Sequence, residues 1–194
     1  MSPRTRTIAL LGHPVSHSLS PHFQQAALDA MGVDARYEAW DVEPDDLRGA
    51  VERLRSGDVL GANVTVPHKV GVFRLVDRPD GLAERVGAVN TIVNRAGILE
   101  ATNTDVAGIL RSLEGVGVAL QGKRVALIGA GGAARAVVVA LRTAGVARIT
   151  VINRTPANAA ALNTLGGDEV DMRYAPLDRE DATFRGAIRT ADVV

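Results

Sequence analysis

The sequence has 194 residues, of which 46% are hydrophobic and 23% are charged, so it is long enough to bury a sizeable core in one or two domains. Basic and acidic residues number 22 each, and this zero net charge gives no electrostatic reason to expect a nucleic acid or an anionic membrane as a partner. The absence of cysteine excludes disulfides, cysteine-ligated zinc and thiol catalysis, and it fits a reducing compartment.

Neither a leader nor a membrane span is evident in the sequence. The apolar run from Ile8 to Leu11 is too short for the apolar region of a signal peptide, and no stretch approaches the ~20 apolar residues of a membrane helix. We therefore expect a cytoplasmic protein. The histidines do not have the spacing of a metal site, and no cysteine or paired carboxylate completes one, so no metal is assigned.

The first half of the chain alternates short apolar runs with amphipathic stretches, which predicts an α/β fold with mostly parallel strands. Ser20 is expected to cap a helix that starts at Pro21 and stops near Gly32. The apolar face of that helix is formed by Phe23, Ala26, Ala27, Ala30 and Met31. Further on we expect a helix over 44–55 and strands over 8–11, 36–42, 62–66, 88–94 and 98–102, with the last two forming a hairpin that turns at 95–97.

The second half repeats the alternation of strands and helices. Helices are expected over 105–113, 133–144 and 156–165, and strands over 124–128, 148–153 and 172–176. We place the domain boundary between residues 104 and 105, with a second hinge over 115–122. The final stretch, 191–194, has the composition of the start of a buried strand, and stopping there would expose an apolar sheet edge. The second domain is therefore expected to be incomplete at its C-terminus.

A glycine turn directly after the strand at 124–128 predicts a dinucleotide site. Gly129 permits a tight turn, Gly131 lets the backbone approach a pyrophosphate, and the following helix presents free N–H groups to that anion. The expected cofactor contacts are Gly129, Ala130, Gly131, Gly132 and Ala133. The alternative is a tight turn without a ligand.

The end of the next strand indicates the type of dinucleotide. An acidic residue there would bind the ribose 2′-hydroxyl of NAD, whereas this sequence has Asn153, Arg154 and Thr155. A guanidinium group matches the oxygens of a 2′-phosphate, so NADP is favoured over NAD. The alternative is a solvated Arg154 beside a threonine that only caps the next helix.

Four polar segments in the first half follow or flank predicted strands: residues 12–21, 63–69, 88–91 and 103–105. Ligands of open α/β sheets gather at the carboxyl ends of strands. The hydroxyl, amide, ammonium and carboxylate groups of these segments would suit a small polyhydroxylated acid.

The motifs HSLSP (17–21), NVTVPHK (63–69), AVNT (88–91) and NTD (103–105), in this order before GAGGAA (129–134), resemble those of the shikimate dehydrogenase family. The resemblance covers nearly the whole chain. It implies an N-terminal α/β substrate-binding domain followed by a Rossmann-type NADP-binding domain. It also implies the reversible NADPH-dependent reduction of 3-dehydroshikimate to shikimate, on the way to chorismate and the aromatic amino acids.

The same resemblance assigns roles to individual residues. The implied substrate ligands are Ser18 and Ser20 at the carboxylate, and Thr65, Asn90 and Asp105 at the ring hydroxyls, with Asn63 supporting them and Lys69 at the reacting group. Lys69 and Asp105 would form the catalytic pair, because an ammonium can protonate and stabilise a developing alkoxide. Three of these residues also have an ordinary alternative role: Ser20 and Asp105 could be helix caps, and Lys69 could be a surface lysine.

The sequence departs from the family's pattern at three places. Residues 100–102 read Glu-Ala-Thr where a glycine followed by an acid is commoner, and Val106 replaces a frequent glycine; both bear on substrate preference. Asn158 stands where a second arginine often contacts the adenosine phosphate. A quinate or amino-shikimate dehydrogenase therefore stays open as an alternative, as do a non-catalytic fragment and, with less support, a nucleotide-binding regulator. We expect a monomer or a homodimer.

Overall fold

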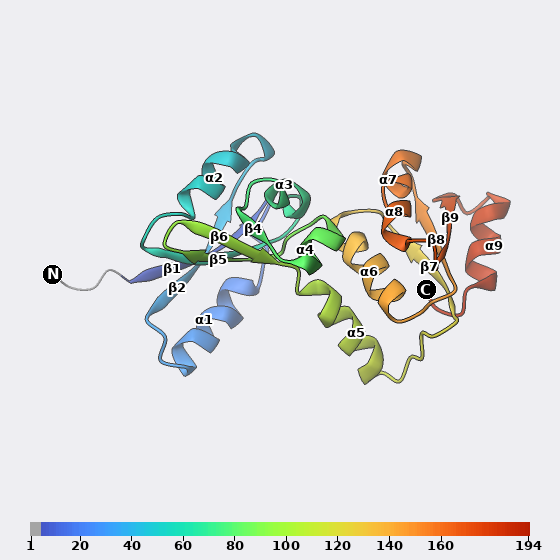
Figure 1. Cartoon of the computed structure of the whole chain (residues 1–194), viewed down its shortest axis with the longest axis horizontal. Helices are drawn as coiled ribbons and strands as arrows, with labels where there is room; N and C mark the ends of the chain where they lie inside the picture. The colour runs from blue at the N-terminus through green and yellow to red at the C-terminus, as the bar shows by residue number, and fades with distance from the viewer. Residues whose placement is uncertain (1–4) are drawn as a thin grey trace. The chain divides into compact units, whose positions relative to one another are not determined.

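The computed structural model describes residues 5–194, and these form two compact units, the first ending at Asn103 and the second starting at Thr104. The first unit is built on a six-stranded sheet and the second on a three-stranded parallel sheet, each with helices packed against it (Figure 1). The predicted α/β fold is confirmed.

The sheet of the first unit brings several strand ends to one edge. Its strand order is β2-β1-β3-β5-β6-β4. Strand β1 runs parallel to β2 and β3, whereas β5 runs antiparallel to β3 and β6, so the chain leaves β1, β3 and β6 and enters β5 at the same edge. The elements are β1 (Arg6–Gly12), α1 (Ser20–Ala30), β2 (Ala35–Asp41), a 3₁₀ turn (Pro44–Asp46), α2 (Leu47–Arg53), β3 (Val59–Val64), α3 (Lys69–Phe73), β4 (Arg78–Pro79), α4 (Gly81–Val86), β5 (Thr91–Arg95) and β6 (Ile98–Thr102).

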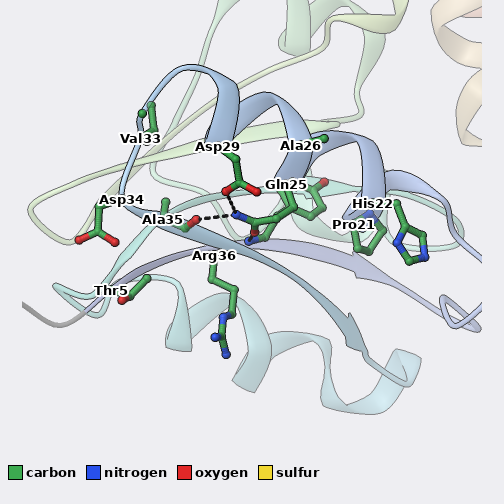
Figure 2. A pocket seen from close by; sticks show the side chains of 12 residues that line it. Thr5, Pro21, His22, Gln25, Ala26, Asp29, Val33, Asp34, Ala35 and Arg36 are labelled. Carbon is green, nitrogen blue, oxygen red and sulfur yellow. Dashed lines mark hydrogen bonds between the residues drawn. The ribbon is translucent and has the colours of Figure 1, made fainter.

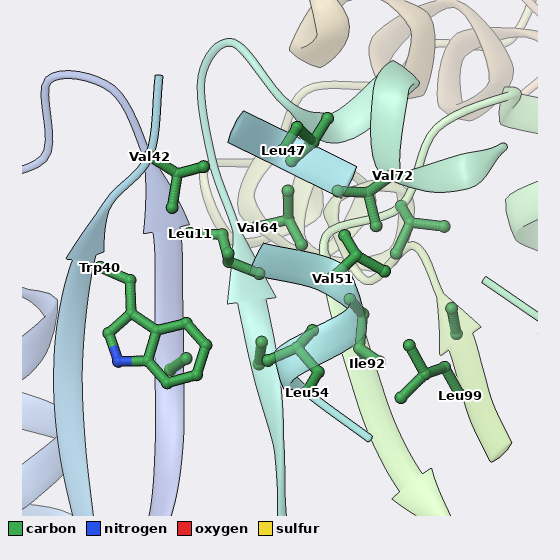
Figure 3. Close-up of a cluster of buried hydrophobic side chains, with 14 of the residues drawn as sticks. Leu11, Trp40, Val42, Leu47, Val51, Leu54, Val64, Val72, Ile92 and Leu99 are labelled. Carbon is green, nitrogen blue, oxygen red and sulfur yellow. The ribbon is translucent and has the colours of Figure 1, made fainter. Parts of the chain in front are cut away.

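The main core of the first unit lies between this sheet and α2, α3 and α4. Leu54, just after α2, and Leu11 of β1 are fully buried there beside Ile92 and Leu99 of the hairpin strands (Figure 3). Leu10, the neighbour of Leu11, points to the opposite face, where a smaller cluster packs against α1. Because β1 is buried on both faces, its sequence is a continuous apolar run rather than an alternating one.

Helix α1 does not bury the apolar face that its sequence suggests. Phe23 is 58% exposed and Met31 is 76% exposed. Leu28 contacts the small cluster on the sheet instead. Gln25 faces β2: its Nε2 donates to the carbonyl of Ala35 at 3.2 Å (Figure 2). Its Oε1 accepts from the N–H of Tyr37 at 2.8 Å. A side-chain amide therefore forms hydrogen bonds with backbone groups at the open edge of β2, where another strand could otherwise pair.

The second unit is a βαβαβ arrangement with strand order β7-β8-β9, all parallel. Helix α6 contributes a fully buried face, and Phe184 and Ile188 of α9 pack on Ala126, Ile152 and Ala175 of the three strands. Its elements are α5 (Asp105–Gly115), β7 (Arg124–Ile128), α6 (Gly132–Thr143), β8 (Arg148–Asn153), α7 (Pro156–Ala160), α8 (Asn163–Gly166), β9 (Asp171–Pro176) and α9 (Ala182–Thr190).

Several predicted elements need correction. Helix α1 begins at Ser20 with Leu19 as its N-cap, so Ser20 is not the cap. Strand β3 spans Val59–Val64 and so ends before residue 66, because the chain turns at Thr65, whose carbonyl accepts from the N–H of His68 at 2.9 Å. The predicted strand at 191–194 is an isolated parallel bridge between Val193 and Val125. The sequence reading also missed α3, α4, β4 and α9.

Gln25 offers a test of how the edge of β2 is stabilised. Replacing it (Gln25→Ala) should lower the free energy of unfolding by about 1 kcal/mol, because the N–H of Tyr37 and the carbonyl of Ala35 lose their partner. Trp40, the single tryptophan, lies on β2 and reports urea unfolding of the first unit by fluorescence. Gln24→Ala is the matched control, because Gln24 makes no side-chain hydrogen bond within residues 5–194. Equal losses in both variants would contradict the proposed edge contact.

The glycine turn before α6 gives a second stability test. Gly129 has a φ of +104°, which is strained for any residue with a side chain, whereas Gly131 has an ordinary φ of −85°. Gly129→Ala should therefore destabilise the second unit by about 1–3 kcal/mol, and Gly131→Ala should leave its stability nearly unchanged. Hydrogen exchange of the α6 amides measures both. The same protection in the two variants would show that the turn tolerates a side chain at 129.

Candidate active site

The four polar segments of the first half meet at one edge of the first unit's sheet, apart from Thr104 and Asp105, which belong to the second unit. The N–H of Thr65 donates to the carbonyl of Leu11 at 2.8 Å, which ties the segment after β3 to the end of β1. The carbonyl of Asn90 accepts from the N–H of Val64 at 2.9 Å, and the N–H of Asn90 donates to the carbonyl of Thr102 at 3.1 Å. The backbone itself therefore gathers these segments.

The close approach of β1 to the segment after β3 requires a glycine at position 12. A Cβ atom at Gly12 would lie 2.5 Å from Cγ2 of Thr65. The half-buried Thr65 side chain therefore rests directly on the end of β1. Any side chain at position 12 would displace it.

The serine loop, residues 13–20, follows β1. Ser18 and Ser20 are both half-buried, and Ser18 Oγ accepts a hydrogen bond from the N–H of Ser20 at 3.2 Å. The contact holds the two residues close together at the start of α1. Because an accepting hydroxyl can still donate its own proton, this pair has donors to offer to a carboxylate.

A polar network connects β2 with the segment before β5. The hydroxyl of Tyr37 donates to Asn63 Oδ1 at 2.8 Å, and Asn63 Nδ2 lies 3.4 Å from both Thr91 Oγ1 and the carbonyl of Asn90. Thr91 Oγ1 donates to Asn90 Oδ1 at 3.0 Å, which orients the amide of Asn90. Burial raises the pKa of Tyr37 to about 12, so its hydroxyl stays a donor at all ordinary pH values.

The sequence reading missed Tyr37. The sequence feature that could have indicated it is a tyrosine at an inward position of a strand, because there the ring is buried and the hydroxyl needs a partner. Asn63 was predicted in a supporting role, and its contacts with Asn90 and Thr91 fit that role.

Lys69 and Asp105 each occupy the first residue of a helix. Lys69 starts α3 in the first unit, is half-buried, and its carbonyl accepts from the N–H of Val89 at 2.9 Å. Asp105 starts α5 in the second unit, following the N-cap Thr104. Lys69 thus belongs to the same sheet edge as the serine loop, and its pairing with Asp105 stays a prediction.

The glycine turn of the second unit has the geometry of an anion site. Gly131 is the N-cap of α6, and a Cβ atom added there would meet no atom within 4 Å apart from those of its immediate chain neighbours, among the described residues. The N–H of Gly129 donates to the carbonyl of Ile152 at 2.8 Å and holds the turn against β8. The first N–H groups of a twelve-residue helix therefore face open space, which fits a pyrophosphate.

The segment after β8 presents a cation and polar groups. Arg154 is exposed and makes no hydrogen bond or ion pair within the described residues. Asn153 Nδ2 donates to the carbonyl of Thr155 at 3.0 Å and shapes the turn. Thr155 is the N-cap of α7, but its hydroxyl does not cap the helix, so the capping alternative does not account for this side chain.

Other features of the described residues add little to this picture. The groove of about 960 Å³ between α1 and β2 is lined by residues such as His22, Asp29 and Arg36 and by none of the predicted ligands (Figure 2). Within residues 5–194, no group of three or more histidines and carboxylates could hold a metal ion. Of the helices in that range, none has the length and apolar composition needed to cross a bilayer.

Two family models match the chain. Residues 10–92 match the shikimate dehydrogenase substrate-binding domain, and residues 112–194 match shikimate/quinate 5-dehydrogenase. Together they include all of the predicted site residues except Asp105.

Individual relatives agree with the family models. The chain is 47% identical over 193 residues to the NADP(+) shikimate dehydrogenase of Moorella thermoacetica, which aligns with 98% of this chain and 64% of the relative. The crystal structure of shikimate 5-dehydrogenase from Listeria monocytogenes, in complex with shikimate and NAD, is 33% identical with a TM-score of 0.82, over 98% of this chain and 68% of that one.

A third relative carries both expected ligands. Shikimate 5-dehydrogenase from Thermus thermophilus, in complex with NADP(H) and shikimate, is 40% identical with a TM-score of 0.76 over 88% of this chain and 63% of that one. The chain thus spans about two thirds of the length of these relatives and matches them in both of its units. It belongs to the shikimate dehydrogenase family.

Proposed function

We propose that the protein is an NADP-dependent shikimate dehydrogenase that interconverts 3-dehydroshikimate and shikimate. The observation that supports the proposal is that the segments carrying Ser18, Thr65, Lys69 and Asn90 follow or precede strands at one edge of the first unit's sheet, in a chain of this family. The first unit would be the substrate-binding domain and the second the dinucleotide-binding domain. A cytoplasmic location and a monomeric or homodimeric state remain expectations.

The polar groups at this edge suit the parts of a shikimate molecule. The hydroxyls of Ser18 and Ser20 would donate to the carboxylate. Thr65 and Asn90 would bind the ring hydroxyls, and the contacts of Asn63 with Asn90 and Thr91 would keep the amide of Asn90 oriented before substrate arrives. Such preorganisation lowers the cost of ordering side chains during binding.

Lys69 would carry the proton that the reaction requires. Reduction of the 3-dehydroshikimate carbonyl adds a hydride to carbon and a proton to oxygen, and NADPH supplies the hydride when it is bound. The Lys69 ammonium would donate to the carbonyl oxygen, stabilise the developing negative charge and release the proton to it. In the opposite direction, the neutral amine would accept the proton of the hydroxyl.

Asp105 would orient that ammonium and accept from a neighbouring substrate hydroxyl. It follows Asn103 by two residues, and Asn103 is fully buried in the first unit, where its Nδ2 donates to the carbonyl of Ala88 at 3.0 Å. Two residues span at most about 7 Å. The covalent chain alone therefore keeps the backbone of Asp105 near the end of β6, which supports its proposed role.

The cofactor would be held mostly by backbone groups. The N–H groups at the start of α6 would bind the pyrophosphate, and the turn of Gly129, Ala130 and Gly131 would leave space for it. Arg154 would bind the 2′-phosphate, with Asn153 and Thr155 shaping its surroundings.

The activity test compares the two lysines of the chain, Lys69 and Lys123. Lys69→Ala should lower kcat for shikimate-dependent NADP⁺ reduction by about 10²–10⁴-fold, the usual contribution of a positioned acid or base. Lys123→Ala removes an exposed lysine of the second unit and should leave kcat unchanged. Quinate should be a poor substrate in the same assay.

The outcomes separate the alternatives. Turnover of quinate at a rate above that of shikimate would reassign the substrate. A folded wild-type chain with neither turnover nor shikimate binding by calorimetry would favour the non-catalytic alternative. Equal activity of the wild-type and Lys69→Ala proteins would refute the proposed role of this lysine.

The preference for NADP is tested by binding alone. Arg154→Ala should weaken NADP⁺ binding by about tenfold or more, the effect of losing one charge-assisted hydrogen bond, and should hardly change NAD⁺ binding. Titration calorimetry measures both affinities. The control is Arg189→Ala on α9, also an exposed arginine without an ion pair inside residues 5–194. An equal loss for NAD⁺ and NADP⁺ would show that Arg154 does not read the 2′-phosphate.

A further inference from the structure

We propose that His68 is a positioning residue that fixes Lys69 relative to the serine loop; this inference rests on the proposed function. His68 directly precedes Lys69 and is only 2% exposed, although Val66, two residues earlier, is 65% exposed. The turn after β3 thus points an imidazole ring into the protein. A buried polar ring requires a hydrogen-bonding partner.

That partner belongs to Val42, the residue that directly follows β2. His68 Nε2 lies 2.6 Å from the carbonyl oxygen of Val42. Because a carbonyl oxygen can only accept, Nε2 must carry the proton and donate it. The side chain of His68 therefore ties the turn that carries Lys69 to the strand on the far side of β1.

The same contact reaches the serine loop through one more residue. The N–H of Val42 donates to the carbonyl of Gly12 at 3.0 Å, and Gly12 is the last residue before the serine loop. Gly12, Val42 and His68 thus form a continuous path of hydrogen bonds from the end of β1 to the residue before Lys69. This path joins the residue before the serine loop to the residue before the proposed proton donor.

Lys69 needs such a tie because its own helix is short. Helix α3 has five residues, and so short a helix is not stable by itself. Its start is held by the bond from His68, by the bond between the Lys69 carbonyl and the N–H of Val89, and by the burial of Val72. The first of these bonds is the one that a side chain provides.

The test uses two substitutions of different hydrogen-bonding capacity. His68→Phe keeps a planar ring without a donor, and His68→Gln places an amide N–H near the position of Nε2. In His68→Phe, kcat for shikimate oxidation should fall about ten- to a hundredfold, the effect of a small displacement of a reacting group, while KM for shikimate rises far less. His68→Gln should recover most of kcat, and NADP⁺ binding by calorimetry should be unchanged in both.

A measurement independent of turnover follows Lys69 itself. In protein labelled with ¹³C-lysine, the two lysines give separate Cε signals, and the Lys123 signal serves as the internal control. The Lys69 signal should move in His68→Phe and return in His68→Gln, with the Lys123 signal fixed. An unmoved Lys69 signal together with an unchanged kcat would overturn the inference.

Two further outcomes are informative. If the wild-type protein neither turns over shikimate nor shows a Lys69 signal that responds to it, the proposed function fails, while the Lys69 signals of the two variants still decide the positioning role. If His68→Phe does not fold, ¹⁵N-histidine spectra of the wild-type protein decide instead, with His68→Gln identifying the resonance. A protonated Nε2 supports the inference, and a neutral ring protonated at Nδ1 overturns it.

Discussion

The parallel pairing of β1 with β3 is the constraint on which the first unit's site depends. It sends the chain out of both strands at one edge, and the antiparallel β5 starts at that same edge. The bonds from Thr65 to Leu11 and from Val64 to Asn90 then lock three segments that are far apart in sequence. The residues that follow these strands therefore lie at the same edge, so the sheet topology determines where a ligand can bind.

In the proposed function, the second unit would bind its ligand mainly with backbone groups. A pyrophosphate is the same in every dinucleotide, so helix N–H groups and a side-chain-free turn are sufficient to bind it. Gly129 supplies the positive φ that the turn needs, and Gly131 supplies the space. Discrimination requires a side chain, and the exposed Arg154 after β8 offers one. Affinity and selectivity would thus come from separate parts of the unit.

Local patterns in the sequence predicted most of this arrangement. The glycine turn, the hairpin at 95–97 and the runs of β1, β7 and β8 carry strong local signals, and the structure contains each of them. Features that depend on long-range contacts were not predicted. The exposed face of α1 could not be predicted from the local apolar pattern. The helix turns Gln25 towards β2, where its side chain bonds the backbone of Ala35 and Tyr37, and these contacts are long-range. The five-residue α3 was missed because it is stabilised by contacts from distant segments rather than by its own periodicity.

Buried polar side chains beside the candidate site help to keep the shape of its backbone. Between helices and strands, carbonyl groups lack the regular partners of those elements, and burial makes an unpaired carbonyl costly. His68 satisfies the carbonyl of Val42 and Asn103 satisfies that of Ala88. Each of these side chains lies next to, or two residues before, a proposed catalytic residue. The hydrogen bond of His68 that completes the backbone would therefore also restrict the position of Lys69. An apolar side chain of equal size would fill the same space without fixing that orientation.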